Sequence, residues 1–532
     1  AIMAMRENAR PLGEAAFVGL LLSGVFVVVT LLFLLCFAVS NPMHLRSGGA
    51  IVSVERLVEA KDSEFTLRDK VIDNGLRGKL GSIDSIQPPP EISEDEDLVT
   101  VDETISILDD FLHSLHKGLS DEANGSRDFR KYHQIYHDLA VEKLYNYDLR
   151  YFKHMPRRRD DDSIYLSVAS YRDENCFNTL KRAYKYATNP NKLNVGLVQQ
   201  NCVANCMSGV LVGGKVEPVP PDDDCYQLFC GSEIGKPHCD SGRVRVLHVN
   251  ETESLGPYTA RYFASKLWDG ESWFMQIDSH MSFAQGWDSD SVTMLLRAPS
   301  DKPIISHYPP ECDEVNFTRA RLKPAPRICG AIFSESNVEH QIVRLEECNV
   351  YDKKHLDIPR FAPFVAAGYF VAHSDFLRDV PFDPFLPWVF MGEEIIMSAR
   401  LWTFGYDIFS PTHSVVGHMY VRRHKPKYWE SVWRFLGQNA DGMIEEMVIH
   451  RLKYQLGYME SAPDLVWPSS VFFGLDHYTM GNVRSVKDYM EMVGLDPVNK
   501  KAYKVEWCKK GEPPGFNEDK AYLYNNAENS LI

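Results

Sequence analysis

The spacing of apolar segments from Ile164 onward constrains the fold of this chain more than any other feature. Short apolar runs with the composition of buried strands lie at 164–169, 193–199, 244–249 and 272–277. Helical patterns separate some of these runs, at 178–187 and 258–267. Strands that alternate with helices predict an α/β domain with a mostly parallel sheet. Ligands of such sheets bind at the carboxyl ends of the strands, so the residues that follow each strand are the first candidates for a site.

A second feature, an uncharged apolar run at 15–39, predicts a membrane anchor. About 20 apolar residues in a helix span a bilayer. The alternative is a cleaved signal peptide, for which Ala38-Val39-Ser40 offers small residues, but the apolar part of a signal peptide has only about 7–15 residues. Arg6 and Arg10 before the run favour a cytoplasmic tail at 1–14.

The residues between this run and the α/β region differ from both in composition. Pro88-Pro89-Pro90 and the acidic residues 91–97 are typical of a solvated linker. Helical patterns lie on either side of 124, one of them at 129–151. We therefore expect a partly helical stem at 40–160 that could self-associate, a catalytic domain at 161–500 and a C-terminal tail at 501–532.

Charge, cysteines and glycosylation motifs bear on the compartment. The 57 Lys and Arg against 73 Asp and Glu give a net charge of −16, which argues against a partner such as nucleic acid. The sequence has 11 cysteines, and without Cys36 in the apolar run an even number remains, which suits disulfides. Glycosylation motifs begin at Asn124, Asn250 and Asn316. Together with the anchor, these features predict a single-pass type II protein of the Golgi membrane with a lumenal catalytic domain.

The strongest chemical motif is Asp278-Ser279-His280, directly after the apolar strand at 272–277. Alternate residues at a strand end point the same way, so Asp278 and His280 can share one ion. A carboxylate and an imidazole suit a Mn²⁺-type ion that also holds diphosphate oxygens. The alternative is a turn in which Asp278 caps the next element and His280 is merely exposed.

Other polar residues follow later apolar segments. Glu393 and Glu394 begin a predicted helix, where the helix dipole favours carboxylates; the alternative is a simple helix cap. His418 follows the apolar residues 415–416 and is a candidate third metal ligand, or else a buried core histidine. Arg422 offers a guanidinium suited to phosphate, or else belongs to a solvated basic surface.

Several motifs resemble one glycosyltransferase family, the polypeptide or hydroxyproline α-N-acetylglucosaminyltransferases of protists, which use UDP-GlcNAc. They are IYLSVASYRD at 164–173, GPYTAR at 256–261, MQIDSHMSF at 275–283, VPFDPFLPWVFMGEEIIMSARLWTFGYDIFSP at 380–411 and YTMGNVRSVKDYMEMVGLD at 478–496. The resemblance therefore extends over 164–496 and omits the predicted anchor and stem.

The resemblance implies a GT-A-type nucleotide-sugar fold and a divalent metal, expected to be Mn²⁺. It implies Asp278 and His280 as metal ligands, with His418 as the third by analogy with polypeptide GalNAc-transferases. Residues expected at the UDP part of the donor are Ser170, Tyr171, Arg172, Asp173, Arg261 and Arg422. Glu393 and Glu394 would face the sugar or the acceptor and act in catalysis.

The implied reaction moves GlcNAc from UDP-GlcNAc to a Ser or Thr hydroxyl of a mucin-like protein, or to hydroxyproline, with retention at the anomeric carbon. A divalent ion would neutralise the charge that develops on the departing UDP. Two alternatives stay open: a membrane-anchored lectin-like or scaffold protein with the same fold, and a lumenal metallohydrolase that uses Asp278, His280 and His418.

The stretch 201–240 departs from the family pattern. It is rich in Pro and Asp and holds five cysteines: Cys202, Cys206, Cys225, Cys230 and Cys239. We expect disulfide bonds among them in an oxidising compartment, and the alternative that their spacing suggests is a zinc site.

Overall fold

The computed structural model describes most of the chain from residue 98 onward. The described residues are 98–123, 128–208, 216–312, 325–335, 341–350, 358–422, 425–431, 436, 444–458 and 469–513. All of them belong to one compact unit, Ser93–Ile532. The predicted cytoplasmic tail, anchor and acidic linker lie outside the described residues, as does the C-terminal end from 514. Among the described helices, none is both long and apolar enough to cross a membrane.

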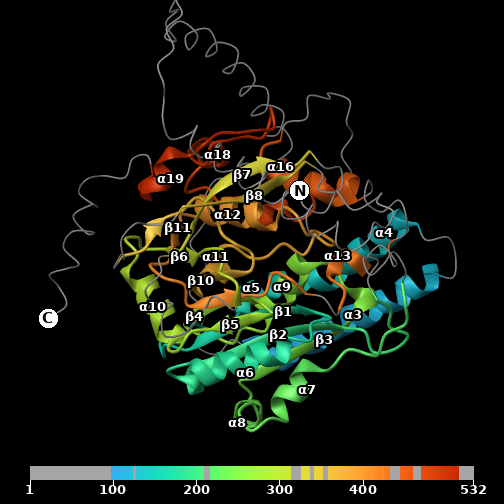
Figure 1. The fold of residues 1–532 in the computed structure, drawn as a ribbon. Helices are drawn as coiled ribbons and strands as arrows, with labels where there is room; N and C mark the ends of the chain where they lie inside the picture. The colour runs from blue at the N-terminus through green and yellow to red at the C-terminus, as the bar shows by residue number, and fades with distance from the viewer. Residues whose placement is uncertain are drawn as a thin grey trace, which may run out of the picture. The chain divides into compact units, whose positions relative to one another are not determined.

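Within this part of the chain, an eight-stranded mixed sheet has the order β3-β2-β1-β4-β10-β6-β11-β9 (Figure 1). The strands are β1 (Ile164–Tyr171), β2 (Leu193–Asn201), β3 (Val244–Asn250), β4 (Trp273–Asp278), β6 (Pro303–Ser306), β9 (Arg360–Phe361), β10 (Tyr369–His373) and β11 (Asp407–Ser410). β1 is parallel to β2 and β4, and β2 is parallel to β3, whereas β10 is antiparallel to β4 and β6. The predicted α/β class with a mostly parallel sheet is confirmed.

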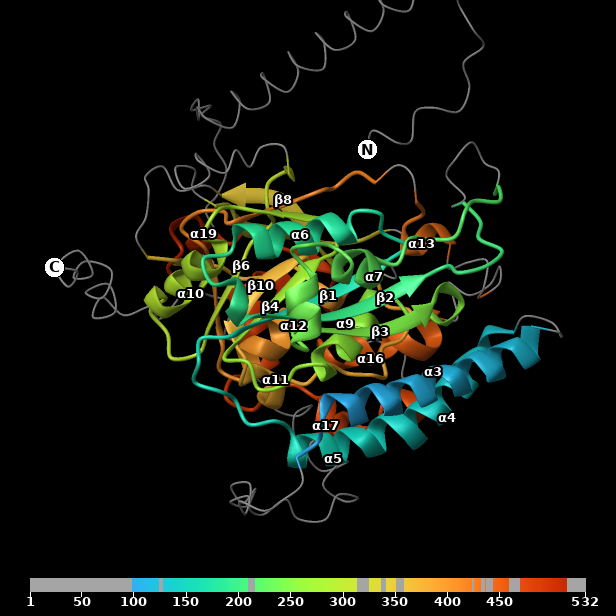
Figure 2. The same ribbon diagram turned by 90° about the horizontal axis from the view of Figure 1, so that it is seen from below.

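Helices cover both faces of the sheet (Figures 1 and 2). One face packs on α6 (Cys176–Tyr186), α7 (Cys225–Cys230) and α10 (Trp287–Arg297), and the other on α9 (Pro257–Lys266), α12 (Glu393–Thr403) and α16 (His450–Gln455). Side chains alternate between the two cores, so Phe274 of β4 joins one and Met275 the other. Because both faces are buried, the central strands are continuously apolar in sequence.

The helices before the sheet form part of the same core. They are α3 (Val101–Ala123), α4 (Phe129–Leu139), η3 (Ala140–Tyr145) and α5 (Asn146–His154), and α3 and α4 lie side by side in Figure 2. The ring of Phe111 lies 6.0 Å from that of Phe263 on α9. The Lys266 ammonium of α9 lies 2.7 Å from the Asp148 carboxylate of α5, and both side chains are buried. The described part of the predicted stem thus packs as part of the domain.

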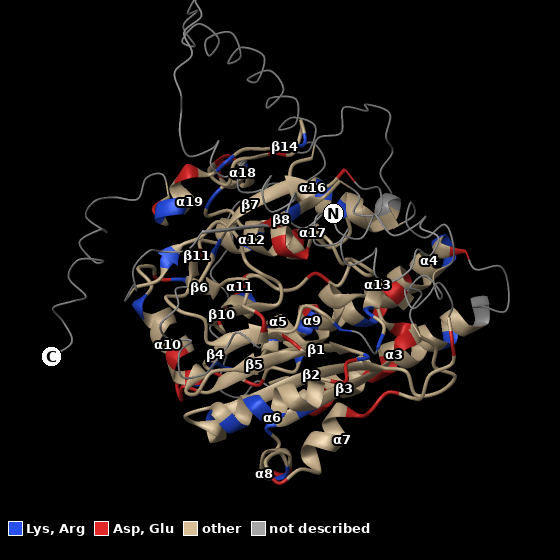
Figure 3. Ribbon diagram, in the orientation of Figure 1, with Lys and Arg blue, Asp and Glu red and all other residues tan. Residues whose placement is uncertain are grey.

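Disulfide bonds tie down the cysteine-rich region and confirm the predicted bonding. The pairs are Cys176–Cys225, Cys202–Cys206 and Cys230–Cys239. All five cysteines of the stretch 201–240 are thereby used, so the zinc alternative is excluded for them. The first bond joins α6 to α7, which extends the helical layer on that face. Basic residues lie on the solvent side of α6, where Figure 3 shows blue segments: Lys181, Arg182 and Lys185.

Smaller elements complete the domain. The hairpin of β7 (Arg327–Phe333) and β8 (Val343–Val350) is antiparallel, and so is the pair of β5 (Met281–Phe283) and β12 (Val416–His418). The remaining elements are η4 (Pro190–Lys192), α8 (Lys236–Asp240), η5 (Glu251–Glu253), α11 (Phe376–Asp379), α13 (Tyr428–Ser431), η9 (Glu445–Ile449), η10 (Ser469–Val471), α17 (Leu475–Tyr478), α18 (Val486–Met492), β13 (Leu495–Asp496), β14 (Lys501–Ala502) and α19 (Glu506–Lys510). A disulfide, Cys329–Cys508, joins β7 to α19.

Candidate active site

A cavity of about 1090 Å³ opens at the carboxyl ends of the parallel strands β1, β2 and β4. Its wall there includes Ala169, Gln200 and Asp278. The opposite wall comes from the start of α12, the loop after β6 and the β7–β8 hairpin. This is the position at which a sheet of this kind binds ligands, and the volume suits a ligand as large as a nucleotide sugar.

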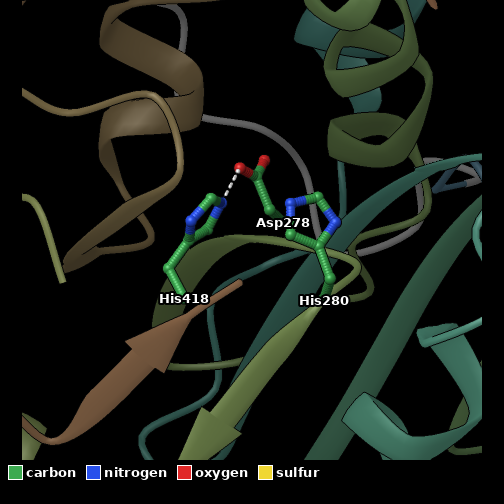
Figure 4. A group of neighbouring side chains, drawn as sticks. All are labelled: Asp278, His280 and His418. Atoms are coloured by element: carbon green, nitrogen blue, oxygen red, sulfur yellow. Dashed lines mark hydrogen bonds and ion pairs between the residues drawn. The ribbon is translucent and has the colours of Figure 1, made fainter. Parts of the chain in front are cut away.

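The three residues predicted as metal ligands lie together in this cavity (Figure 4). Asp278 ends β4, His280 lies in the turn to β5, and His418 ends β12, which pairs with β5 at His418–Met281. The antiparallel pairing of β5 with β12 therefore carries His418 to the strand-end pair. One ligand atom of each residue lies within 4.8 Å of the others, and Nε2 of His418 lies 3.1 Å from Oδ2 of Asp278.

The chemistry of these side chains fits a divalent cation. Nδ1 of His280 is paired with Oδ2 of Asp173 at 2.6 Å, which leaves Nε2 of His280 for an ion. A carboxylate behind a metal-binding histidine fixes the orientation and tautomer of the ring. One carboxylate oxygen and two imidazole nitrogens form a donor set that suits Mn²⁺ or a similar ion.

Two charged side chains support His280: Asp173, which is paired with its ring, and Arg422, which is paired with Asp173. The buried Asp173 carboxylate also accepts a hydrogen bond from Ser279 Oγ at 2.7 Å and lies 3.1 Å from Nη1 of Arg422. Burial raises the pKa of Asp173, but the hydrogen bond and charge of His280, with Arg422, outweigh it and hold that pKa well below its usual range. Asp173 is therefore an anion that positions His280, and it is not among the cavity-lining residues.

Arg261 of α9 connects the end of β4 to the start of α12. Its Nη2 donates to Oδ1 of Asp278 at 2.7 Å, and its Nη1 donates to Oε2 of Glu393. The side chain is 5% exposed, so both pairs form in a poorly hydrated environment in which hydrogen-bonded charges interact strongly. Burial raises the pKa of Asp278, yet His418 and Arg261 together lower it far below its usual range. Asp278 is therefore charged and suited to bind a cation.

The predicted catalytic pair Glu393 and Glu394 begins α12 and lines the cavity. Oε1 of Glu394 accepts from the backbone N–H of Ala367 at 3.0 Å, and Oε2 accepts from the hydroxyl of Tyr308 at 2.8 Å. Burial raises the pKa of Glu394 to about 7, although these two hydrogen bonds oppose it. Burial also raises the pKa of Glu393, with Arg261 opposing it. Glu394 can therefore exchange a proton near neutral pH.

The residues of the segment 170–173 were all predicted to contact the donor, but only some of them line the cavity. Tyr171 lines the cavity, and its ring packs edge-on against Tyr428 with centroids 5.6 Å apart. Ser170 and Arg172 do not line it. Arg172 is fully buried and its guanidinium pairs with Asp222 at 2.8 Å and Glu251 at 2.7 Å. The structure thus gives Arg172 a scaffolding role in place of the predicted donor contact.

Sequence analysis did not single out several residues that line the cavity. Tyr308 follows β6 and holds Glu394, and Gln200 lies near the end of β2. Lys427 precedes α13, and Arg344 lies on β8. Gln200 could have been found because it directly follows the strand predicted at 193–199. Tyr308 and Lys427 follow no distinctive sequence signal and reach the cavity only through the folding of the chain.

Comparison with known proteins adds the family. Solved structures with similar folds include one described as GalNAc-T7 with UDP, GalNAc and Mn²⁺, at 12% identity and a TM-score of 0.36 over 63% of this chain and 59% of that one. Another is S. aureus TarS 1–349 in complex with UDP-GlcNAc, at 10% identity and a TM-score of 0.29 over 70% and 93% of the two chains. The chain therefore spans less than two thirds of the first of these structures.

Sequence comparison gives a more specific result. No curated protein sequence matches the chain. Residues 163–499, more than half of the chain, match the family described as Glycosyltransferase (GlcNAc). The matched range begins at β1, ends after α18 and includes each residue of the metal-ligand cluster and both glutamates. The chain therefore belongs to this glycosyltransferase family.

Proposed function

We propose that this chain is a metal-dependent, retaining glycosyltransferase that moves GlcNAc from UDP-GlcNAc to a Ser or Thr hydroxyl of a protein, or to hydroxyproline. The observation that supports this most directly is the placement of Asp278, His280 and His418 in the same cavity as Glu393 and Glu394, in a chain of the glycosyltransferase family. The motif resemblance supports the narrower choice of donor and acceptor. The fold would be of the GT-A type.

The proposed mechanism follows from where the charged groups lie. A divalent ion bound by Asp278, His280 and His418 would neutralise negative charge on the departing diphosphate. The bond between the anomeric carbon and the β-phosphate oxygen breaks, and the acceptor oxygen bonds to the same face of that carbon. The acceptor proton passes to the departing phosphate oxygen, so retention needs no covalent enzyme intermediate.

The chain's own residues hold the reacting groups in position. Arg261 holds the Asp278 and Glu393 carboxylates at a fixed separation, and Asp173 fixes the ring of His280. Glu393 would face the sugar, where a buried carboxylate can accept hydrogen bonds from sugar hydroxyls. Glu394, with a pKa of about 7, lies beside Tyr308 and can hold a proton near the acceptor.

The test is a donor and acceptor screen with the purified protein and Mn²⁺. UDP-GlcNAc and UDP-GalNAc are each offered with Thr-rich, Ser-rich and hydroxyproline peptides, and the products are read by mass spectrometry. We expect a peptide mass increase of one N-acetylhexosamine with UDP-GlcNAc, lost when EDTA is added. Transfer from UDP-GalNAc alone would refute the donor assignment. Binding of UDP without any turnover would support the lectin-like alternative, and hydrolysis without nucleotide binding would support the metallohydrolase.

We also propose that the catalytic domain faces the Golgi lumen on a type II anchor. The described disulfides suit an oxidising compartment. Asn250 of one glycosylation motif is the last residue of β3, is partly exposed and caps η5. Asn124 and Asn316 lie outside the described residues. Glycosidase treatment of the native protein should lower its mass, and an unglycosylated protein with reduced Cys176 and Cys225 would refute the assignment.

A further inference from the structure

Lys427 differs from the other cations of the cavity because its ammonium has no polar partner among the residues that the structure describes. The cavity-lining cations are Arg261, Arg344, Arg422 and Lys427. Arg261 is used by Asp278 and Glu393, and Arg422 donates to the Tyr171 carbonyl at 3.0 Å as well as pairing with Asp173. Arg344 is exposed on β8 at the outer wall. No hydrogen bond or ion pair joins the ammonium of Lys427 to any residue that the structure describes.

The backbone around Lys427 is fixed next to the end of β1. Its N–H donates to Oε2 of Glu430 at 2.9 Å, and its carbonyl accepts from Ser431 Oγ at 3.3 Å. Ser431 Oγ in turn lies 2.5 Å from the hydroxyl of Tyr171. The Lys427 ammonium lies 5.2 Å from the centre of the Trp429 ring, an attraction of only about 0.5–1 kcal/mol at an exposed site. The side chain is therefore placed in the cavity but is free to bind an anion there.

The sheet register puts Tyr171, which contacts the Lys427 segment through Ser431, close to Asp278 of the metal-ligand cluster. Asp278 of β4 pairs with Ala169 of β1, two residues before Tyr171. A nucleotide bound with one end at β1 and β2 and the other at an ion on Asp278 would have its diphosphate between Tyr171 and Asp278. Two phosphates bring more negative charge than one divalent ion with an anionic aspartate ligand can neutralise. A further cation is needed, and Arg261 and Arg422 are already paired with carboxylates.

We propose that Lys427 binds the diphosphate of the nucleotide-sugar donor and stabilises the negative charge of the departing UDP. This inference rests on the proposed function, because it names a contact of the same donor. The ammonium of a lysine is a compact point charge on a flexible side chain, and such a charge suits phosphate oxygens. The positive charge of Lys427 would then act together with that of the ion on the diphosphate, and it comes from the segment between β12 and α13.

The experiment measures binding of UDP, UMP and uridine by calorimetry in the presence of Mn²⁺, in the parent protein and in Lys427→Ala. A charge-assisted hydrogen bond contributes about 1.5–3 kcal/mol, so we expect UDP affinity to fall about 10- to 100-fold. Uridine affinity should stay the same, because uridine has no phosphate. Lys427→Arg should retain most of the UDP affinity, since it keeps the charge.

Lys425→Ala is the matched control. Lys425 is two residues away, but its ammonium pairs with Asp222 at 2.7 Å and it does not line the cavity, so its loss should leave UDP affinity unchanged. A cooperative thermal unfolding transition in each variant would show that the variant is folded before the measurement. Equal UDP affinity in the parent and Lys427→Ala, or equal losses for UDP and uridine, would overturn the proposal while leaving the proposed function intact. If the parent protein binds neither uridine nor UDP measurably, both this proposal and the proposed function are refuted.

Discussion

The carboxylate of Asp173, two residues after the end of β1, lies 2.6 Å from Nδ1 of His280, in the turn after β4. The two residues are 107 positions apart in the chain and meet because β1 and β4 are parallel neighbours. The pair directs the other nitrogen of His280 toward Asp278 and His418. Asp173, which sequence analysis assigned to the donor, therefore orients His280, one of the three candidate metal ligands.

Replacing Asp173 should weaken ion binding without removing a ligand. In Asp173→Asn the shape remains, but the negative charge that orients His280 is lost. Changes of this kind cost about 10- to 100-fold in metal affinity. Calorimetric titration with Mn²⁺ in the absence of donor measures the effect. Asp240→Asn is a matched control, because Asp240 is exposed and pairs only with Lys236 on α8 among the described residues. Unchanged Mn²⁺ affinity in Asp173→Asn would contradict the positioning role.

Asp278→Asn should have a larger effect, because it removes the charged ligand itself. We expect Mn²⁺ affinity and transfer to fall together by on the order of 10²-fold or more. The same change leaves Arg261 with Glu393 as its remaining carboxylate partner, so the fold should persist. Mn²⁺ titration, a transfer assay and thermal unfolding on one preparation separate these effects. If Asp278→Asn binds Mn²⁺ and transfers sugar like the parent, the metal-site assignment is wrong.

The raised pKa of Glu394 predicts a stability that depends on pH. Burial raises this pKa from 4.5 to about 7, so the folded protein holds the proton more tightly than the unfolded chain. The resulting stabilisation is complete below about pH 4.5 and is lost as the pH rises through 7. Its size is on the order of 3 kcal/mol. Glu394→Gln cannot titrate, so its unfolding free energy should decline less than that of the parent between pH 5 and 8. Parallel pH profiles for the two proteins would contradict the assignment.

Glu394 should also shape the pH dependence of transfer. If the ionised carboxylate holds the acceptor, transfer rises with pH through an apparent pKa near 7 in the parent. Glu394→Gln should transfer more slowly and lack this step, while its affinity for UDP with Mn²⁺ stays close to the parental value. A variant that keeps the parental pH profile would show that another group titrates.

The disulfide Cys329–Cys508 should stabilise one wall of the cavity. It joins residues 179 positions apart, and Arg327 reinforces it by donating to the carbonyls of Cys508 at 2.9 Å and Lys509 at 2.8 Å. Loss of such a long-range bond typically costs about 2–5 kcal/mol. The double variant Cys329→Ser/Cys508→Ser should therefore unfold at lower denaturant concentration than the parent.

The matched control for this prediction is the double variant Cys202→Ser/Cys206→Ser. Its bond joins residues only 4 positions apart, so it restricts the unfolded chain much less. Limited proteolysis should cut the β7–β8 hairpin faster in the first variant than in the second. Equal stability losses in the two variants would contradict a specific role for the long-range bond.

The sequence by itself determined the class of the fold and placed two of the three candidate metal ligands together. Apolar runs and helical periodicity depend on neighbouring residues, so the strands at 164–171, 193–201, 244–250 and 273–278 were predictable from local pattern. Asp278 and His280 were predictable for the same reason, since a strand end determines the direction of alternate side chains.

Only the tertiary structure decided which distant residues complete the site. His418 meets Asp278 across 140 positions through the pairing of β12 with β5, and Tyr308 meets Glu394 across 86. Arg172 and Asp173 are neighbours in sequence, yet one enters a buried ion-pair network and the other supports His280. Such contacts depend on the packing of the whole sheet and its helices, because the free energy that brings two distant segments together is distributed over many residues outside the motif.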